Sequence, residues 1–288
     1  AKWEGGKSAV TTFDIRVIAS PVVSQPKQFL AGVAIRPYTA DQWPDFIKQY
    51  ASLGFSHMDF WHGVIHNTSK PDQSVLKLVE QARANQIIVS IDSSWWWDSK
   101  VLKEDPDSLA VFAKDGRRGT VKDMEICPSY RGPGIMNRIK SNAQVARSGI
   151  SSILSDEECY GHYNNFHYAC VCPRCEERWR QWLPEHRPLL EYRSAREVVA
   201  NYQEMPEYWR AWTWFRASLT TERYGIIKQE IVKAVQEHGA ESSPRPMLGF
   251  WSGQVDPEDG VSKRHQDGRG LAEVIDFVMP MVYYRYNY

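Results

Sequence analysis

Short apolar runs alternate with amphipathic stretches along most of this chain. Short apolar runs of this kind are typical of buried strands. Between the runs, apolar residues recur at spacings of three and four, which predicts helices. The expected strands cover residues 30–35, 55–61, 86–92, 150–156, 247–251 and 274–284. The expected helices cover residues 39–53, 72–85, 134–148, 173–183 and 206–239.

Strands that alternate with helices predict an α/β fold with a parallel sheet, because parallel neighbours need helical crossovers. We expect a (βα)8 TIM-type barrel that is incomplete at the C-terminus. Only about six of the eight βα units of such a barrel are visible, and the missing two would lie beyond Tyr288. A doubly wound open sheet is the competing interpretation. No Gly-x-Gly-x-x-Gly follows the first strand, which disfavours a dinucleotide-binding fold.

The first residues are expected to precede the barrel. Phe13, Ile15 and Val17 alternate with polar neighbours, as in a half-buried strand. We therefore assign residues 1–27 to a lead-in strand or linker, the end of a preceding domain, and residues 28–288 to the barrel. The chain starts without Met and ends as abruptly, so we expect both ends to be cut points.

Three acidic residues, Asp156, Glu157 and Glu158, directly follow the fourth expected strand. Mutual repulsion and burial raise the proton affinity of at least one such carboxylate. A carboxylic acid that stays protonated near neutral pH can protonate a departing glycosidic oxygen. The alternative is a solvated acidic turn or a helix N-terminus. A position at the C-terminal end of a barrel strand favours the catalytic interpretation.

Cysteines form the second candidate cluster, and the chain has five of them: Cys127, Cys159, Cys170, Cys172 and Cys175. The run Cys-x-Cys-x-x-Cys can place three thiolates on one tetrahedral ion, with Cys127 as the fourth ligand. Such four-thiolate sites are closed and structural, and zinc is their usual occupant. Cys159 is an alternative fourth ligand, and His162 or His167 could substitute. Disulfides or free thiols are the other interpretations.

The order of these features carries a resemblance. A strand, an acid cluster, Tyr160-Gly161 and the cysteine run are followed by Trp179, Trp182 and Leu183. This order resembles the β-galactosidases of glycoside hydrolase family 42, which belong to a clan of retaining (βα)8-barrel β-glycosidases. The resemblance covers roughly residues 30–288 and is specific at 127–183. It implies a hydrolase of β-linked sugars and strengthens the zinc assignment, since some members hold zinc with one upstream cysteine and a matching Cys-x-Cys-x-x-Cys.

In that family the fourth strand ends in Asp-Asn-Glu, and its Glu is the acid/base. Matching the Asp to Asp156 implies Glu158 as acid/base, which we favour, whereas matching Asn-Glu to the next pair implies Glu157. The Asn, which contacts the sugar 2-hydroxyl, is missing here, so Asp156 or Glu157 would have to replace it. The family's nucleophile follows strand seven and is expected beyond Tyr288.

Polar and aromatic residues at the C-terminal ends of the other expected strands predict a sugar-binding cleft, because those ends converge on one face of a barrel. Tryptophans would stack on sugar rings, and charged groups would bind hydroxyls. The candidates are Arg36, Asp59, Trp61, His62, Asp92, Trp95, Trp96, Trp251, Tyr283 and Tyr284. His57, in mid-strand, is assigned to the core. A non-catalytic carbohydrate-binding barrel with an aromatic-lined cleft is the alternative function.

Composition limits the partners. Lys plus Arg and Asp plus Glu both total 35, so no basic surplus exists to bind nucleic acid. No apolar run is long enough to span a membrane. The 12 Trp, 14 Tyr and 10 Phe fit stacking on an oligo- or polysaccharide. No organic cofactor is expected. The sequence leaves homo-oligomerisation open, and leaves open whether the protein is secreted or cytoplasmic.

Overall fold

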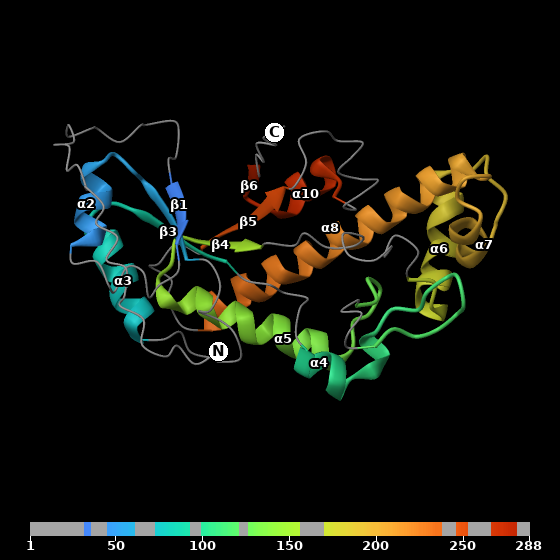
Figure 1. Cartoon of the computed structure of the whole chain (residues 1–288), viewed down its shortest axis with the longest axis horizontal. Helices are drawn as coiled ribbons and strands as arrows, with labels where there is room; N and C mark the ends of the chain where they lie inside the picture. The colour runs from blue at the N-terminus through green and yellow to red at the C-terminus, as the bar shows by residue number, and fades with distance from the viewer. Residues whose placement is uncertain are drawn as a thin grey trace, which may run out of the picture.

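The computed structural model describes residues 32–35, 45–60, 73–92, 99–120, 126–155, 170–237, 246–252 and 266–280 (Figure 1). Its strands are β1 Gly32–Ile35, β2 His57–Phe60, β3 Ile88–Asp92, β4 Ser152–Ser155, β5 Met247–Ser252 and β6 Phe277–Pro280. Its α-helices are α2 Phe46–Ser52, α3 Gln73–Ala84, α4 Ser99–Glu104, α5 Pro133–Ala143, α6 Pro173–His186, α7 Ala195–Ala200, α8 Pro206–Glu237 and α10 Gly268–Val274. Two short 3-10 helices, Pro106–Ser108 and Gln144–Ser148, complete the elements.

All described strands belong to one parallel sheet in the order β1-β2-β3-β4-β5-β6. Each strand pairs with the next one along the chain, which is the order of a (βα) barrel. A doubly wound sheet would reverse its order at a switch point, so that interpretation is wrong. Each of the six expected strands is confirmed. In the described part of the chain, β1 and β6 form the two edges of an incomplete barrel.

The middle strands of the sheet are buried on both faces, one lined by apolar side chains and the other by polar ones such as Ser90 and Ser152. Alternation along the strands places Met58, Val89 and Ile153 on one face, and all three are fully buried. On α3, the apolar side chains Leu78 and Val79 are buried. Helix propensity alone holds such a segment weakly, so burial of this apolar stripe supplies most of its stability.

The five expected helices are confirmed with changed bounds. The expected start near Thr39 lies outside the described residues; α2 begins at Phe46, because Asp45 has a φ of 58° that an α-helix cannot include. The helix expected at 134–148 becomes 3-10 helix after Ala143 and ends at Gly149, whose φ is 72°. The short helices α4, α7 and α10 were not predicted.

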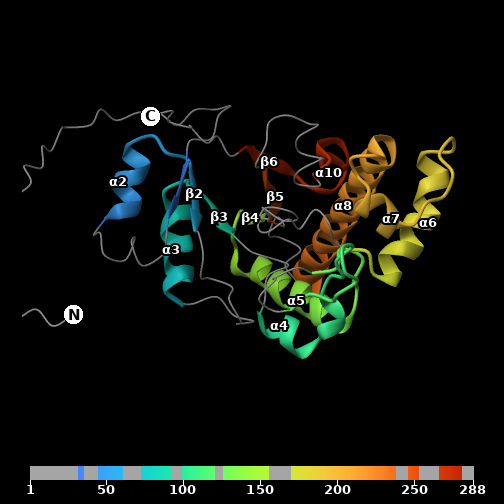
Figure 2. The same cartoon turned by 45° about the vertical axis from the view of Figure 1, so that its right-hand side comes forward.

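Helix α8 is the longest element and links two parts of the molecule. Its C-terminal half packs against α5 and α10 beside the sheet, and its N-terminal half packs against α6 and α7 (Figures 1 and 2). Trp179 of α6 meets Trp212 of α8 edge-on, with ring centroids 5.4 Å apart. At the other end, Arg147 Nε donates to the carbonyl of Ala234 over 3.0 Å. Within the described ranges, every helix is too short or too polar to cross a lipid bilayer.

A polar chain crosses the other face of the sheet. His57 Nε2 is hydrogen-bonded to Ser90 Oγ, which is hydrogen-bonded to Ser152 Oγ, so three neighbouring strands are joined through side chains. His57 is 5% exposed, which confirms its assignment to the core. Burial lowers the pKa of His57 from 6.5 to about 4, because an imidazolium is poorly solvated there.

His57 should therefore make the fold sensitive to mild acid. The unfolded chain binds a proton as the pH falls through 6.5, whereas the folded chain resists protonation until about 4, so stability is lost across that window. We expect this residue to remove about 2 kcal/mol from the free energy of unfolding between about pH 7 and pH 5. Urea unfolding at several pH values measures it. His57→Gln should lose about 2 kcal/mol less than the wild type over that range.

The exposed-site variant His186→Gln controls for loss of any histidine. If the free energy of unfolding changes with pH equally in the wild type and in His57→Gln, burial does not lower the pKa of His57 and the prediction is wrong.

Candidate functional site

Two chain segments bring four cysteines together. Cys127 precedes α5, and its N–H donates to the carbonyl of Ser108 over 2.7 Å. Cys170 and Cys172 precede α6, and Cys175 lies in its first turn. Val171 N–H donates to the carbonyl of Val111 over 2.9 Å, which fixes the second segment against the loop before the first.

The four sulfur atoms are spaced as ligands of one ion. Cys127 Sγ lies 3.4 Å from Cys172 Sγ and 3.6 Å from Cys175 Sγ, and all four ligand atoms lie within 4.8 Å of one another. A tetrahedron with metal–sulfur bonds of about 2.3 Å has sulfur–sulfur edges of about 3.8 Å. A disulfide needs about 2.05 Å, and these cysteines are free. The residues therefore fit a tetrahedral metal ion, with Cys127 as the fourth ligand.

Close packing also shifts the pKa values of the four cysteine thiols. Hydrogen bonds from the thiols of Cys170, Cys172 and Cys175 hold the pKa of Cys127 well below its ordinary value. Burial raises the pKa of Cys170 and Cys175. For Cys172, the bond with Cys127 raises the pKa, but the bonds with Cys170 and Cys175 bring it to about 7. Without an ion the cluster favours one thiolate among thiols, and a divalent cation would draw off the remaining protons.

Polar groups surround the sulfur atoms. Val111 N–H donates toward Cys170 Sγ over 3.2 Å, whereas Ser129 Oγ accepts a hydrogen bond from Cys175 Sγ over 3.2 Å. Arg174 stacks over the ring of Tyr130 with its guanidinium 4.9 Å from the ring centroid. Burial lowers the pKa of Arg174, but the negative charge of Cys127 and Cys172 outweighs burial and raises it. The Val111 N–H and the Arg174 guanidinium suit an anionic centre.

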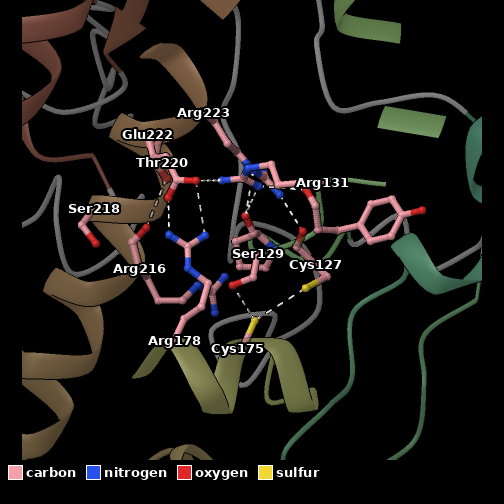
Figure 3. Close-up of polar contacts among 12 residues, drawn as sticks. Cys127, Ser129, Arg131, Cys175, Arg178, Arg216, Ser218, Thr220, Glu222 and Arg223 are labelled. Carbon is pink, nitrogen blue, oxygen red and sulfur yellow. Dashed lines mark hydrogen bonds and ion pairs between the residues drawn. The ribbon is translucent and has the colours of Figure 1, made fainter. Parts of the chain in front are cut away.

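A chain of charged groups joins the cluster to α8 (Figure 3). Glu222 of α8 accepts a hydrogen bond from Arg131 over 3.0 Å and also pairs with Arg178, one turn beyond Cys175 on α6. Burial raises the pKa of Glu222, but Arg178 and Arg131 together lower it below its ordinary value. Next to it, Arg223 is 1% exposed and donates to the carbonyls of Cys127 and Pro128 over 2.6 and 3.0 Å.

Sequence reasoning missed these partners of the cluster. The sequence patterns predicted no role for Arg131, Arg178, Glu222 or Arg223. Yet three polar residues are buried at helical spacing on α8: Arg216, Thr220 and Arg223. Charged residues recurring on an otherwise apolar helical stripe were the available signal.

The predicted acid cluster and most of the predicted cleft lie outside the described residues. Asp59 is described: it is 2% exposed and lies on the same sheet face as His57. Asp92 is the last residue of β3, and Trp251 lies in β5. Those outside the described ranges are Arg36, Trp61, His62, Trp95, Trp96, Asp156, Glu157, Glu158, Cys159, His162, His167, Tyr283 and Tyr284. The lead-in segment 1–27 also lies outside them, so the domain division stays a prediction.

Comparisons with known proteins reveal a likeness in structure. No protein-family model and no curated protein sequence matches the chain. A β-galactosidase from the Antarctic haloarchaeon Halorubrum lacusprofundi superposes with a TM-score of 0.59 at 15% identity, covering 90% of this chain and 42% of its own. A catalytic mutant of the GH42 β-galactosidase Gan42B from G. stearothermophilus superposes with a TM-score of 0.54 at 13% identity. The match covers 90% of this chain and 40% of that one.

The glycoside hydrolase domain of PgaB (BpsB) from Bordetella bronchiseptica gives a TM-score of 0.56 at 12% identity, covering 87% of this chain and 73% of that domain. The chain thus spans less than half the length of the two β-galactosidases. At these identities the likeness shows the fold, which is that of the glycoside hydrolase barrels. The resemblance to family 42 is confirmed as a distant structural one.

The sulfur geometry predicts one divalent ion per chain. Titration with Co²⁺ should produce the intense thiolate charge-transfer and d–d absorption of a tetrahedral tetrathiolate, saturating at about one equivalent. Cys127→Ser should weaken the affinity by more than about 100-fold, beyond the loss seen for outer-shell partners.

Cys159→Ser is the matched control, since Cys159 is the alternative fourth ligand. A spectrum lost in Cys159→Ser and retained in Cys127→Ser would contradict the ligand set. Absence of any cobalt spectrum in the reduced wild type would contradict the site.

Proposed function

We propose that this chain is a glycoside hydrolase that cleaves β-linked sugars by carboxylate acid/base catalysis. One observation carries the proposal: β4, in the middle of the sheet between β3 and β5, ends at Ser155, and Asp156, Glu157 and Glu158 follow directly in sequence. Reactive groups of barrel enzymes sit at this C-terminal edge. The likeness in fold to glycoside hydrolases supports the same reading.

The alternation of β4 supports Glu158 over Glu157 as the acid/base. By the sheet register, Ser152 lies on the polar face, and Ser155 lies on the opposite face, where α8 contacts it. We propose that the period of two continues past β4, which would put Asp156 and Glu158 on the polar side with Asp59, and Glu157 on the side of Ser155. The candidate acid/base is therefore Glu158, with Asp156 as its neighbour.

The chemistry follows from this assignment. Repulsion from Asp156 would keep Glu158 protonated near neutral pH, so that it can protonate the leaving oxygen. The resulting carboxylate would then take a proton from water. A retaining mechanism needs a nucleophilic carboxylate about 5–5.5 Å away and an inverting one about 6.5–9.5 Å. The resemblance to family 42 favours retention, with the nucleophile after strand seven.

Substrate contacts are proposed for the ends of the other strands. Buried Asp59 would accept hydrogen bonds from sugar hydroxyls, and the aromatic residues would stack on pyranose rings. The full proposed set is Arg36, Asp59, Trp61, His62, Asp92, Trp95, Trp96, Trp251, Tyr283 and Tyr284. The ligand is accordingly an oligo- or polysaccharide.

We further propose zinc as the ion of Cys127, Cys170, Cys172 and Cys175. Four thiolates leave no open coordination position, so the ion would be structural. When bound, it would fasten the segment before α5 to the start of α6 and take no part in hydrolysis. The acid/base chemistry itself requires no organic cofactor.

Loss of the proposed acid should abolish most activity without unfolding the chain. Glu158→Gln should lower kcat/KM on an alkyl or 4-nitrophenyl β-glycoside by about 10²–10⁴-fold, the usual range for a positioned general acid. The loss should be smaller on a 2,4-dinitrophenyl glycoside, because that leaving group departs without a proton. A panel of β-galactosides, β-glucosides and related sugars identifies the substrate.

Glu157→Gln is the matched control and should retain activity within about tenfold. A large loss in Glu157→Gln and none in Glu158→Gln would exchange the two roles. Tight oligosaccharide binding by a wild type that cleaves no glycoside would reject hydrolysis and favour a carbohydrate-binding barrel.

A further inference from the structure

Three consecutive residues of α8 reach three different parts of the molecule. Glu222 pairs with Arg131 and with Arg178 of α6, Arg223 contacts the segment of Cys127, and Tyr224 contacts β4. Successive side chains of a helix point about 100° apart, so this arrangement surrounds α8 on several sides. We call residues 222–224 the α8 bridge.

The first span of the bridge leads from the cysteine cluster to α8. Arg223 Nη2 donates to the carbonyl of Cys127 over 2.6 Å, and its Nε donates to the carbonyl of Pro128 over 3.0 Å. The guanidinium is buried, so these charge-assisted hydrogen bonds fix its position. A movement of the Cys127 backbone on ion binding would therefore displace α8.

The second span leads from α8 to the sheet. Tyr224 is fully buried, and its hydroxyl donates to Ser155 Oγ over 2.8 Å. Ser155 is also fully buried and is the last residue of β4. Arg223 and Tyr224 are neighbours on one rigid helix, and close-packed interiors transmit strain. The end of β4 is thus linked to Cys127 through two side chains and one peptide unit.

We propose that Arg223 and Tyr224 are positioning residues that couple metal occupancy of the cysteine cluster to the placement of the C-terminal end of β4. Under the proposed function, on which this consequence rests, the strand end so placed is the one that carries Asp156 and Glu158. The ion would then influence catalysis without touching substrate. By linkage, the coupling acts equally in both directions.

Hydrogen exchange measures the link without any activity assay. In the full chain, Zn²⁺ should slow amide exchange in the peptide that spans β4 by about fivefold, the equivalent of one net hydrogen bond. Tyr224→Phe removes only the hydroxyl and should abolish this zinc-dependent slowing. Ser155→Ala should do the same, and the double variant should add nothing further. Tyr208→Phe removes another hydroxyl of α8, one that donates to the carbonyl of Glu191, and should behave as the wild type.

Zinc affinity gives a second measurement, which does not rely on hydrogen exchange. Competition with a chelator should show Tyr224→Phe and Ser155→Ala binding Zn²⁺ about fivefold more weakly than wild type and Tyr208→Phe. Arg223→Lys keeps the charge, loses the forked contact and should also weaken Zn²⁺ binding. If Tyr224→Phe and Ser155→Ala match the wild type in both affinity and zinc-dependent exchange, or if the wild type itself shows no zinc effect at β4, the coupling is overturned.

Hydrolysis is assayed separately on the substrate found for the wild type. Tyr224→Phe should lower kcat with KM nearly unchanged, because the residue lies away from the polar face that would bind sugar. A wild type that hydrolyses nothing would reject the proposed function, while the exchange and affinity measurements would still decide the coupling.

Discussion

A buried guanidinium must find hydrogen-bond acceptors, since leaving such a charge unpartnered in the interior costs several kcal/mol. Arg223 meets this constraint with the carbonyl oxygens of Cys127 and Pro128. The requirement fixes the segment of Cys127 against α8, and Glu222 fixes α6 to the same point through Arg178. The two halves of the cysteine cluster are therefore held together by charges on a third element, which also contacts the sheet through Tyr224.

The cluster and the arginines are complementary in charge. Four thiolates around a divalent ion carry two negative charges, and Arg131, Arg174 and Arg223 lie around the segments that supply them. A backbone donor, the Val111 N–H toward Cys170, adds partial positive charge at a sulfur atom. Such outer partners orient the ligands of a metal and tune its affinity. The cluster and its surroundings form one electrostatic unit.

Local patterns in the sequence determine much of this architecture. The strands were predictable because apolar residues recur in short segments between the helical stretches, as in Met58 and Phe60, which are fully buried on one face of β2. Cys170, Cys172 and Cys175 were predictable as a cluster because their spacing is short. The contacts of Arg223 join residues 95 and 96 positions apart, so no local pattern contains them. The left-handed turn at Asp45 is likewise set by context rather than by residue type. The acid cluster remains a sequence prediction.

The length of α8 has a consequence for folding. Trp212 and Phe215 pack with Trp179 in the helical arm, while Tyr224 contacts β4 through Ser155, and a single uninterrupted helix of 32 residues carries both. The helical arm, which is formed by α6, α7 and the N-terminal half of α8, cannot unfold alone. Its unfolding would expose apolar surface on a helix that also supports the sheet. Helix formation is cooperative along its length, so the two ends of the continuous hydrophobic core should gain and lose their order together. Arm and barrel thus form a single folding unit, in which damage to one is shared by the other.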